Sequence, residues 1–126
     1  MSKDNPKILV VDDSSTMRRI LKMTLAKCGF PDVSEAGDGK EAVEKCKAET
    51  FEVVLTDWNM PNMDGMELIV SLRALPQYAE TPIMMVTTEG AKDDVIEALT
   101  RGANSYIVKP FTPETLKTKM SELLSN

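Results

Sequence analysis

Histidine is absent from all 126 residues of the chain. Its absence excludes a Ser-His-Asp triad, a histidine general base, histidine metal ligands and a phosphohistidine carried by this chain. Any chemistry must therefore come from carboxylates, lysine, serine, threonine or tyrosine.

Cysteines are few, and long apolar runs are missing. The two cysteines, Cys28 and Cys46, form neither a CxxC pair nor a metal-binding spacing, which favours reduced thiols in a cytosolic protein. No apolar run approaches the roughly 20 residues that a membrane span needs. The N-terminal segment MSKDNPKILVV lacks the apolar stretch of a signal peptide. We therefore expect a cytoplasmic protein.

An excess of positive charge is also missing. The chain has 15 basic and 20 acidic residues, a net charge of −5. This balance argues against a general binder of nucleic acid or of anionic membranes. A length of 126 residues with 42% apolar residues suits one domain with its own core. We expect a single domain over residues 1–126 with no output domain, and a monomer.

Apolar runs of strand length alternate with helical patterns along the whole chain. The strands are expected at 7–12, 32–36, 51–57, 81–88 and 104–110, and the helices at 14–29, 38–49, 63–75, 91–102 and 112–125. This alternation predicts an α/β fold with a five-stranded parallel sheet, doubly wound with right-handed crossovers.

The helices carry recognisable boundaries and apolar faces. Asp64 and Thr112 are expected to cap their helices, and Gly29 and Gly102 to end theirs. Pro113 suits the first helical position. Helix spacing places a set of side chains of the first helix on one inward face: Met17, Ile20, Leu21, Leu25 and Cys28.

Polar residues follow four of the strands, where ligands bind in sheets of this kind. The first strand ends in Asp12 and Asp13, the third in Asp57, the fourth in Thr87 and the fifth in Lys109. The first and third strands of such sheets are commonly neighbours, so the three carboxylates are expected to face one crevice.

Three adjacent carboxylates repel one another unless a cation enters. Oxygen ligands without histidine or cysteine select Mg²⁺ or a similar hard cation, and Mg²⁺ keeps waters that a phosphate oxygen can replace. Asp57 is therefore a candidate nucleophile or ligand in a metal-assisted phosphoryl transfer. Taken singly, Asp12 or Asp13 is more often the cap of the following helix, and this alternative stays open.

Four segments together resemble the response-regulator receiver domains, and within them the stand-alone regulators of chemotaxis. They are LVVDDSSTMRRI (9–20), TDWNMPNMDG (56–65), PIMMVTT (82–88) and YIVKPF (106–111). The resemblance covers essentially the whole chain. It implies a flavodoxin-like (βα)5 fold with strand order 2-1-3-4-5.

The resemblance also implies roles for the acidic residues. Asp57 would accept a phosphoryl group from a phosphohistidine on a sensor histidine kinase. Asp13 and Asp57 would bind Mg²⁺ directly, together with the backbone carbonyl of Asn59, and Asp12 would act through water. The chain itself would be a stoichiometric phosphoacceptor and not an enzyme.

Further roles follow from the same resemblance. Lys109 would pair with the acyl phosphate, and the Lys109–Pro110 bond would be cis. Thr87 would move to bind the phosphoryl oxygen, and Tyr106 would turn inward behind it. The partner would then bind the surface made by helix 91–102, strand 104–109 and helix 112–125.

Positions near the site would tune the loss of phosphate. Asn59 and Glu89 occupy the two variable family positions with this role. Thr88 departs from the small Ala or Gly that the family usually has after the switch threonine, and its branched side chain could narrow access to the phosphate. Met60 and Met63 are expected to pack within their loop.

The implied partners are a CheA-like sensor histidine kinase, a flagellar motor switch protein and a phosphatase. A phosphorelay shuttle or a regulator of surface motility is the alternative within the family. An aspartyl-phosphate hydrolase would need an acid where Asn59 stands. A flavin mononucleotide carrier would need a glycine- and hydroxyl-rich first loop, where this chain has two carboxylates.

Overall fold

Strands and helices alternate along the computed structural model, which describes residues 5–125. The strands are β1 (Ile8–Val11), β2 (Val33–Ala36), β3 (Val53–Thr56), β4 (Ile83–Thr87) and β5 (Ser105–Val108). The α-helices are α1 (Ser15–Lys27), α2 (Gly39–Ala48), α3 (Gly65–Arg73), α4 (Lys92–Arg101) and α5 (Pro113–Leu124). All of the predicted strands and helices are present.

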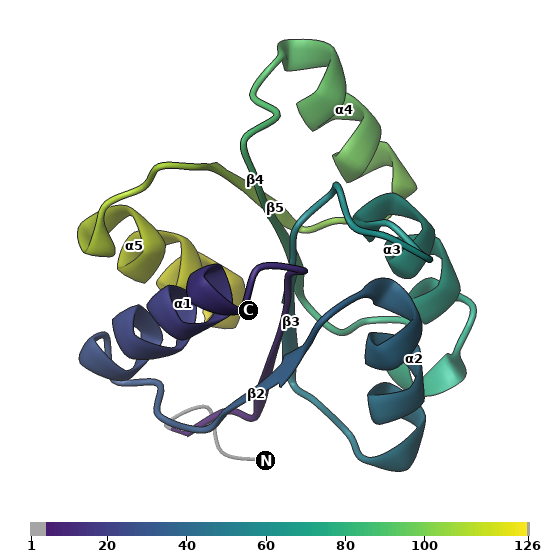
Figure 1. The fold of residues 1–126 in the computed structure, drawn as a ribbon, viewed down its shortest axis with the longest axis horizontal. Coiled ribbons are helices and arrows are strands. Elements are labelled where there is room, and N and C mark those ends of the chain that lie inside the picture. Colours follow the sequence, from purple (N-terminus) through teal and green to yellow (C-terminus); the bar gives the residue numbers. More distant parts are fainter. Residues whose placement is uncertain (1–4, 126) are drawn as a thin grey trace.

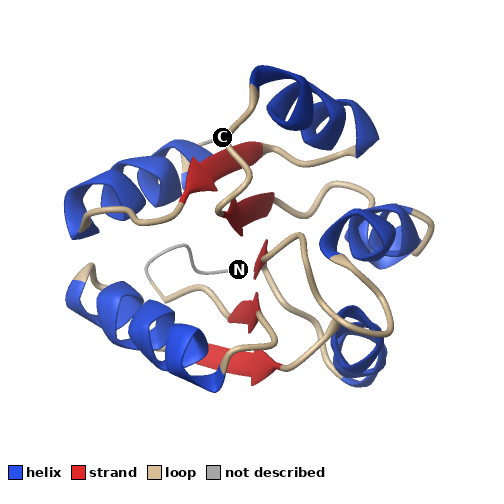
Figure 2. Cartoon of the chain, turned by 45° about the horizontal axis from the view of Figure 1, so that its top comes forward, coloured by secondary structure: helices blue, strands red, loops and turns tan. Residues whose placement is uncertain are grey.

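The five strands form one parallel sheet in the order β2-β1-β3-β4-β5, which confirms the expected topology. Helices cover both faces of this sheet: α1 and α5 lie on one side, and α2, α3 and α4 on the other (Figures 1 and 2). β1 lies between β2 and β3, so Val11 aligns with Ala36 on one side and with Thr56 on the other. The ends of β1 and β3 are therefore adjacent, as the site prediction requires.

Alternate side chains along a strand pack into two separate hydrophobic cores, one on each face of the sheet. Leu9 and Val11 of β1 pack in the cluster under α2, α3 and α4, whereas Ile8 and Val10 pack in the cluster under α1 and α5. All four side chains are completely buried. This two-sided burial explains why β1 reads as a continuous apolar run, because a parallel strand covered on both faces has no polar side.

The predicted caps are present, and one helix face is narrower than predicted. Asp64 caps α3 in a reciprocal capping box with Glu67, and Thr112 caps α5. The expectation that Ile20 faces inward is wrong: 43% of Ile20 is exposed. Leu21 and Leu25 fill the contact with the sheet, and Ile20 lies at the edge of the apolar stripe, beyond the surface that the sheet and α5 cover.

A short 3₁₀ helix, η1 (Pro76–Tyr78), was not predicted. It buries Tyr78 completely under α2 and α3. The Tyr78 hydroxyl lies 2.8 Å from the carbonyl oxygen of Cys46 and accepts a hydrogen bond from the amide of Phe51 at 3.2 Å. Burial raises the pKa of Tyr78 to about 12. η1 thus anchors the turn that leads into β4.

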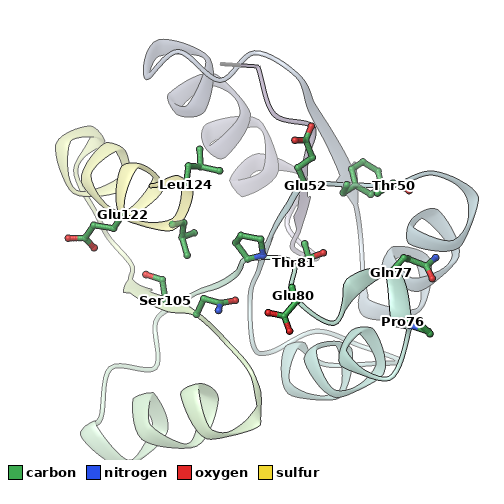
Figure 3. A pocket seen from close by; sticks show the side chains of 13 residues that line it. Thr50, Glu52, Pro76, Gln77, Glu80, Thr81, Ser105, Glu122 and Leu124 are labelled. Atoms are coloured by element: carbon green, nitrogen blue, oxygen red, sulfur yellow. The ribbon is translucent and has the colours of Figure 1, made fainter. Parts of the chain in front are cut away.

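A cavity of about 850 Å³ lies at the amino edge of the sheet, away from the predicted site (Figure 3). Residues just before the strands line it, such as Glu52, Thr81 and Asn104, together with Leu124 at the end of α5. None of the predicted site residues lies in its lining. Within the described part of the chain, no helix is long and apolar enough to cross a membrane.

Candidate functional site

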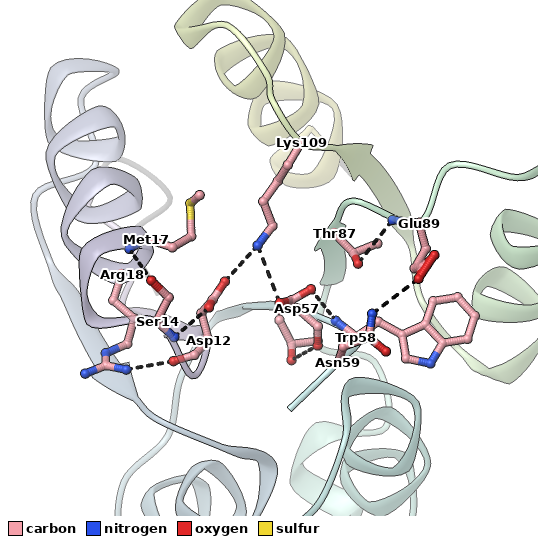
Figure 4. Close-up of polar contacts among 11 residues, drawn as sticks. Asp12, Ser14, Met17, Arg18, Asp57, Trp58, Asn59, Thr87, Glu89 and Lys109 are labelled. Carbon is pink, nitrogen blue, oxygen red and sulfur yellow. Dashed lines mark hydrogen bonds and ion pairs between the residues drawn. The ribbon is translucent and has the colours of Figure 1, made fainter. Parts of the chain in front are cut away.

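Three carboxylates meet at the carboxyl edge of the sheet (Figure 4). Ligand oxygens of Asp12, Asp13 and Asp57 all lie within 4.8 Å of one another. The pairing of β1 with β3 brings them together, and the amide of Asp57 donates a hydrogen bond to the carbonyl of Val11 at 2.9 Å. The sheet therefore assembles the acidic cluster that the strand ends predicted.

Asp12 is held rigidly, although it does not cap α1. It is 2% exposed, and its two oxygens accept hydrogen bonds from the amide of Ser14 at 2.9 Å and from the Lys109 ammonium at 3.0 Å. The cap of α1 is Ser14, whose hydroxyl accepts from the amide of Met17. Since Ser14 caps the helix, the alternative reading of Asp12 and Asp13 as caps is excluded.

A single ammonium group bridges two of the carboxylates. Nζ of Lys109 lies 3.0 Å from Asp12 and 3.4 Å from Asp57. The side chains are mostly buried, with 11% of Lys109 and 12% of Asp57 exposed. Lys109 reaches the cluster from the end of β5, and its peptide bond to Pro110 is cis. The carboxylates still outnumber the cation, so the cluster keeps a negative formal charge that a metal ion can balance.

The loop after β3 folds back tightly beneath Asp57. The amide of Trp58 donates to the Asp57 carboxylate at 2.7 Å, and the amide of Gly65 donates to the carbonyl of Trp58 at 2.8 Å. A Cβ on Gly65 would lie 2.1 Å from the carbonyl oxygen of Asp57. Gly65 therefore allows the start of α3 to approach the strand end, a role that the sequence prediction missed although the Asp-Gly pair was part of the quoted motif.

Two methionines of the same loop face the protein interior. Met60 and Met63 are partly buried and pack against the core beneath α2, α3 and α4, together with Trp58. Both methionines were predicted to pack in their loop; they pack against the core, and Met63 also lines a shallow pocket with Trp58 and Met66. Asn62, in the same loop, has a positive φ of 67° and donates a side-chain hydrogen bond to Asp38.

The predicted switch residues converge on the backbone of Glu89. Thr87 is completely buried, and its hydroxyl lies 3.4 Å from the amide of Glu89. The Tyr106 hydroxyl donates to the carbonyl of the same residue. Tyr106 is 8% exposed, and burial raises its pKa to about 12. Its ring thus already lies in the inward position that the resemblance implies.

The two positions expected to tune dephosphorylation touch each other. The side-chain amide of Asn59 lies 3.4 Å from the Glu89 carboxylate, and both residues are exposed beside the acidic cluster (Figure 4). Thr88 is exposed as well. These side chains therefore stand at the solvent side of the site, where an incoming molecule would meet them.

Comparison with known proteins gives one consistent family. The family model described as the response regulator receiver domain matches residues 8–121. A chemotaxis protein CheY homologue of Campylobacter jejuni is 56% identical over 94% of this chain and 92% of its own length. The chemotaxis protein CheY1 of Helicobacter pylori strain J99 is also 56% identical, over 94% of this chain and 96% of its own.

Solved structures agree with the sequence relatives. Chemotaxis response regulator CheY4 of Vibrio cholerae is 39% identical and superposes with a TM-score of 0.88 over 94% of this chain and 98% of its own. A structure described as a putative response regulator from Chloroflexus aurantiacus, 30% identical, gives a TM-score of 0.91 over 97% of this chain and 99% of its own.

Proposed function

Because the chain belongs to the response regulator receiver domain family, we propose that it is a phosphorylation-activated switch of a two-component system that serves chemotaxis. It is a single receiver domain over residues 1–126, accepts a phosphoryl group on Asp57, and signals by contact with another protein. The observation that carries this proposal is the convergence of Asp57 with Asp12 and Asp13, together with a Lys109 ammonium that contacts both Asp12 and Asp57. The identity of 56% to proteins named for chemotaxis supports the signalling context.

The acidic cluster suits Mg²⁺. Its donors are carboxylate oxygens, and the chain offers no histidine as a competing ligand. Asp13 and Asp57 would hold the ion directly, with the backbone carbonyl of Asn59 as a further ligand and Asp12 through water. When bound, Mg²⁺ neutralises the charge that develops on the transferred phosphoryl oxygens.

The chain's own groups position and stabilise the transfer. A carboxylate oxygen of Asp57 attacks the phosphorus of a phosphohistidine on the sensor kinase; the P–N bond breaks, its electron pair stays on the imidazole, and a P–O bond to Asp57 forms. The Lys109 ammonium, 3.4 Å from Asp57, then lies within reach of a phosphoryl oxygen. The protein is a stoichiometric phosphoacceptor in this scheme and not an enzyme.

Thr87 and Tyr106 would carry the signal outward through Glu89. Rotation of the Thr87 hydroxyl toward the phosphoryl group would remove its contact with the amide of Glu89. The carbonyl of Glu89 holds the Tyr106 hydroxyl, so the loop and the ring would respond together. We therefore expect the change to reach the face made by α4, β5 and α5.

That face has the character of a partner site. Ile96 and Leu99 of α4 and Val108 of β5 are large apolar side chains that are 41–50% exposed. Lys92 and Lys117 lie exposed at its rim, and Lys119 is half-buried. We expect a flagellar motor switch segment to bind here, about 5–150-fold more tightly after phosphorylation. Amide-exchange protection confined to α1 and α2 in that complex would contradict the assignment.

The remaining parts of the proposal follow from the same scheme. The donor is a CheA-like histidine kinase, and Asn59 and Glu89 set how a phosphatase or water reaches the acyl phosphate. We place the protein in the cytoplasm, as a monomer without nucleic-acid or membrane partners, in keeping with its net charge of −5. A phosphorelay shuttle remains the second candidate, and the exposed apolar residues of the α4–β5–α5 face favour the switch over it.

The central test is direct. The protein is incubated with Mg²⁺ and acetyl phosphate, and its intact mass is measured. The wild type should gain one phosphoryl group and Asp57→Asn none. Asp64→Asn is the matched control, because it removes a carboxylate from the same loop while asparagine still caps α3. Equal phosphorylation of Asp57→Asn and the control would refute the assignment of Asp57.

A further inference from the structure

Arg18 connects the acidic cluster to the neighbouring strand. It lies on α1, and its Nη1 donates a hydrogen bond to the backbone carbonyl of Asp12 at 2.7 Å (Figure 4). Its Nε donates to the Glu35 carboxylate on β2 at 3.0 Å. Only 20% of the Arg18 side chain is exposed. One guanidinium thus holds the loop after β1 against β2.

The carbonyl that Arg18 holds belongs to the peptide between Asp12 and Asp13. A peptide unit is planar, so fixing its oxygen also fixes the direction in which the chain enters Asp13. The Asp12 carboxylate has its own partners in Ser14 and Lys109. Asp13 is exposed, and within residues 5–125 no hydrogen bond or ion pair to its carboxylate is present. The orientation of Asp13 therefore depends on the backbone that Arg18 fixes.

Glu35, the other anchor of Arg18, is itself held in place. Nζ of Lys22 on α1 lies 3.8 Å from its carboxylate. Lys45 of α2 donates a hydrogen bond to its backbone carbonyl. Groups from α1, β2 and α2 therefore fix the position from which the guanidinium reaches the Asp12 carbonyl.

We propose that Arg18 is a positioning residue that orients the Asp12–Asp13 peptide so that Asp13 can bind a divalent cation. This inference rests on the proposed function, since it concerns the same acidic cluster. Groups that orient metal ligands typically contribute 10–100-fold to metal affinity. Arg18 acts through the backbone and does not touch the ion.

The sign of the effect separates this role from simple electrostatics. Arg18 is a cation beside a cation site, so removing its charge alone should strengthen Mg²⁺ binding. Loss of the hydrogen bond from Arg18 to the Asp12 carbonyl should instead weaken Mg²⁺ binding. Arg19 provides the matched control: it is the next residue of α1, carries the same charge, is exposed, and makes no side-chain hydrogen bond or ion pair within residues 5–125.

The experiment measures the Mg²⁺ dissociation constant by calorimetry on the full chain, with the fluorescence of its one tryptophan, Trp58, as a second readout. Arg18→Ala should raise the dissociation constant roughly 10-fold, whereas Arg19→Ala should leave it unchanged or slightly lower it. Arg18→Lys keeps a donor and should restore part of the affinity. Urea unfolding of each variant verifies that the titrated protein is folded.

The result for Arg18→Ala can be told apart from a failure of the proposed function. A dissociation constant for Arg18→Ala equal to or below that of Arg19→Ala overturns the inference and leaves the proposed function intact. If Arg18→Ala does not fold, Glu35→Met removes the acceptor of the Arg18 Nε hydrogen bond at nearly the same side-chain length, and an unchanged dissociation constant there overturns the inference. A wild-type protein that binds no Mg²⁺ and gains no phosphoryl group overturns the proposed function and the inference together.

Discussion

Replacing Gly65 by alanine tests the tight return of the loop after β3. The added Cβ would lie 2.1 Å from the carbonyl oxygen of Asp57, and 3.0 Å from both the carbonyl carbon of Asp57 and Cα of Trp58. All three are backbone atoms, so no side-chain rotation relieves the overlap. The loop must move away from the strand end, and this movement stretches the 2.8 Å hydrogen bond from Gly65 to Trp58.

The expected loss of stability follows from two opposing effects. Overpacking in a filled interior typically costs about 1–3 kcal/mol and occasionally more, and the overlap at Gly65 falls at the upper end because the backbone must shift. Alanine returns at most about 1 kcal/mol through its better helix propensity at the first position of α3. We therefore expect the free energy of unfolding to fall by about 2–4 kcal/mol. The folded fraction should also accept phosphoryl groups poorly, because the displaced atoms belong to Asp57.

The assay is urea unfolding followed by far-ultraviolet circular dichroism and by Trp58 fluorescence. Two glycines provide controls. A Cβ on Gly29 meets nothing within 4 Å, so Gly29→Ala carries only the strain of its φ of 97°, about 1–2 kcal/mol. A Cβ on Gly37 would make ordinary contacts of 3.4 and 3.7 Å. A Gly65→Ala protein no less stable than Gly29→Ala would refute the steric argument.

Two further predictions concern other buried groups. Lys109→Met should tighten Mg²⁺ binding on the order of 10-fold, because the Lys109 ammonium contacts Asp12 and Asp57 at 3.0 and 3.4 Å and would compete with a cation for these carboxylates. Unchanged calorimetric affinity would count against this competition. Tyr78→Phe should lower the free energy of unfolding at pH 7 by about 1–3 kcal/mol, since the amide of Phe51 loses a buried acceptor. The folded pKa of Tyr78, about 12, lies above the unfolded value of about 10. Its stabilisation is therefore complete below pH 10 and is lost as the pH rises toward 12. Between pH 10 and 12 the free energy of unfolding should therefore fall less steeply with pH in Tyr78→Phe than in the wild type. An equal pH dependence in both proteins would contradict the role of Tyr78.

Several contacts of the site could be anticipated from local patterns alone. Asp12 and Asp57 each follow an apolar run, and parallel strands place their carboxyl ends on one edge of the sheet. The proximity of the two carboxylates could therefore be predicted once β1 and β3 were taken as neighbours. Asp64 and Thr112 were recognisable as caps because capping depends on the three residues that follow. These features are encoded within a few residues or by simple periodicity.

Other features depend on pairs that are distant in the sequence. Arg18 reads as an ordinary helix residue until β2 places Glu35 beside it. Tyr78 becomes an anchor only because the backbone near Cys46 and Phe51 surrounds its hydroxyl. The spacing of Ile20 indicates an inward face but not how far the sheet and α5 extend across it.

The sequence by itself determined the order of the elements, the strand-end carboxylates and the absence of histidine chemistry, because these follow from composition, periodicity and local turn preferences. The tertiary structure alone decided that Gly65 admits the backbone beneath Asp57, and that Arg18 holds the peptide before Asp13. Such contacts are set by the way the crossover helices pack on the twisted sheet. Packing joins residues across long stretches of chain, and no local pattern records which partners it brings together.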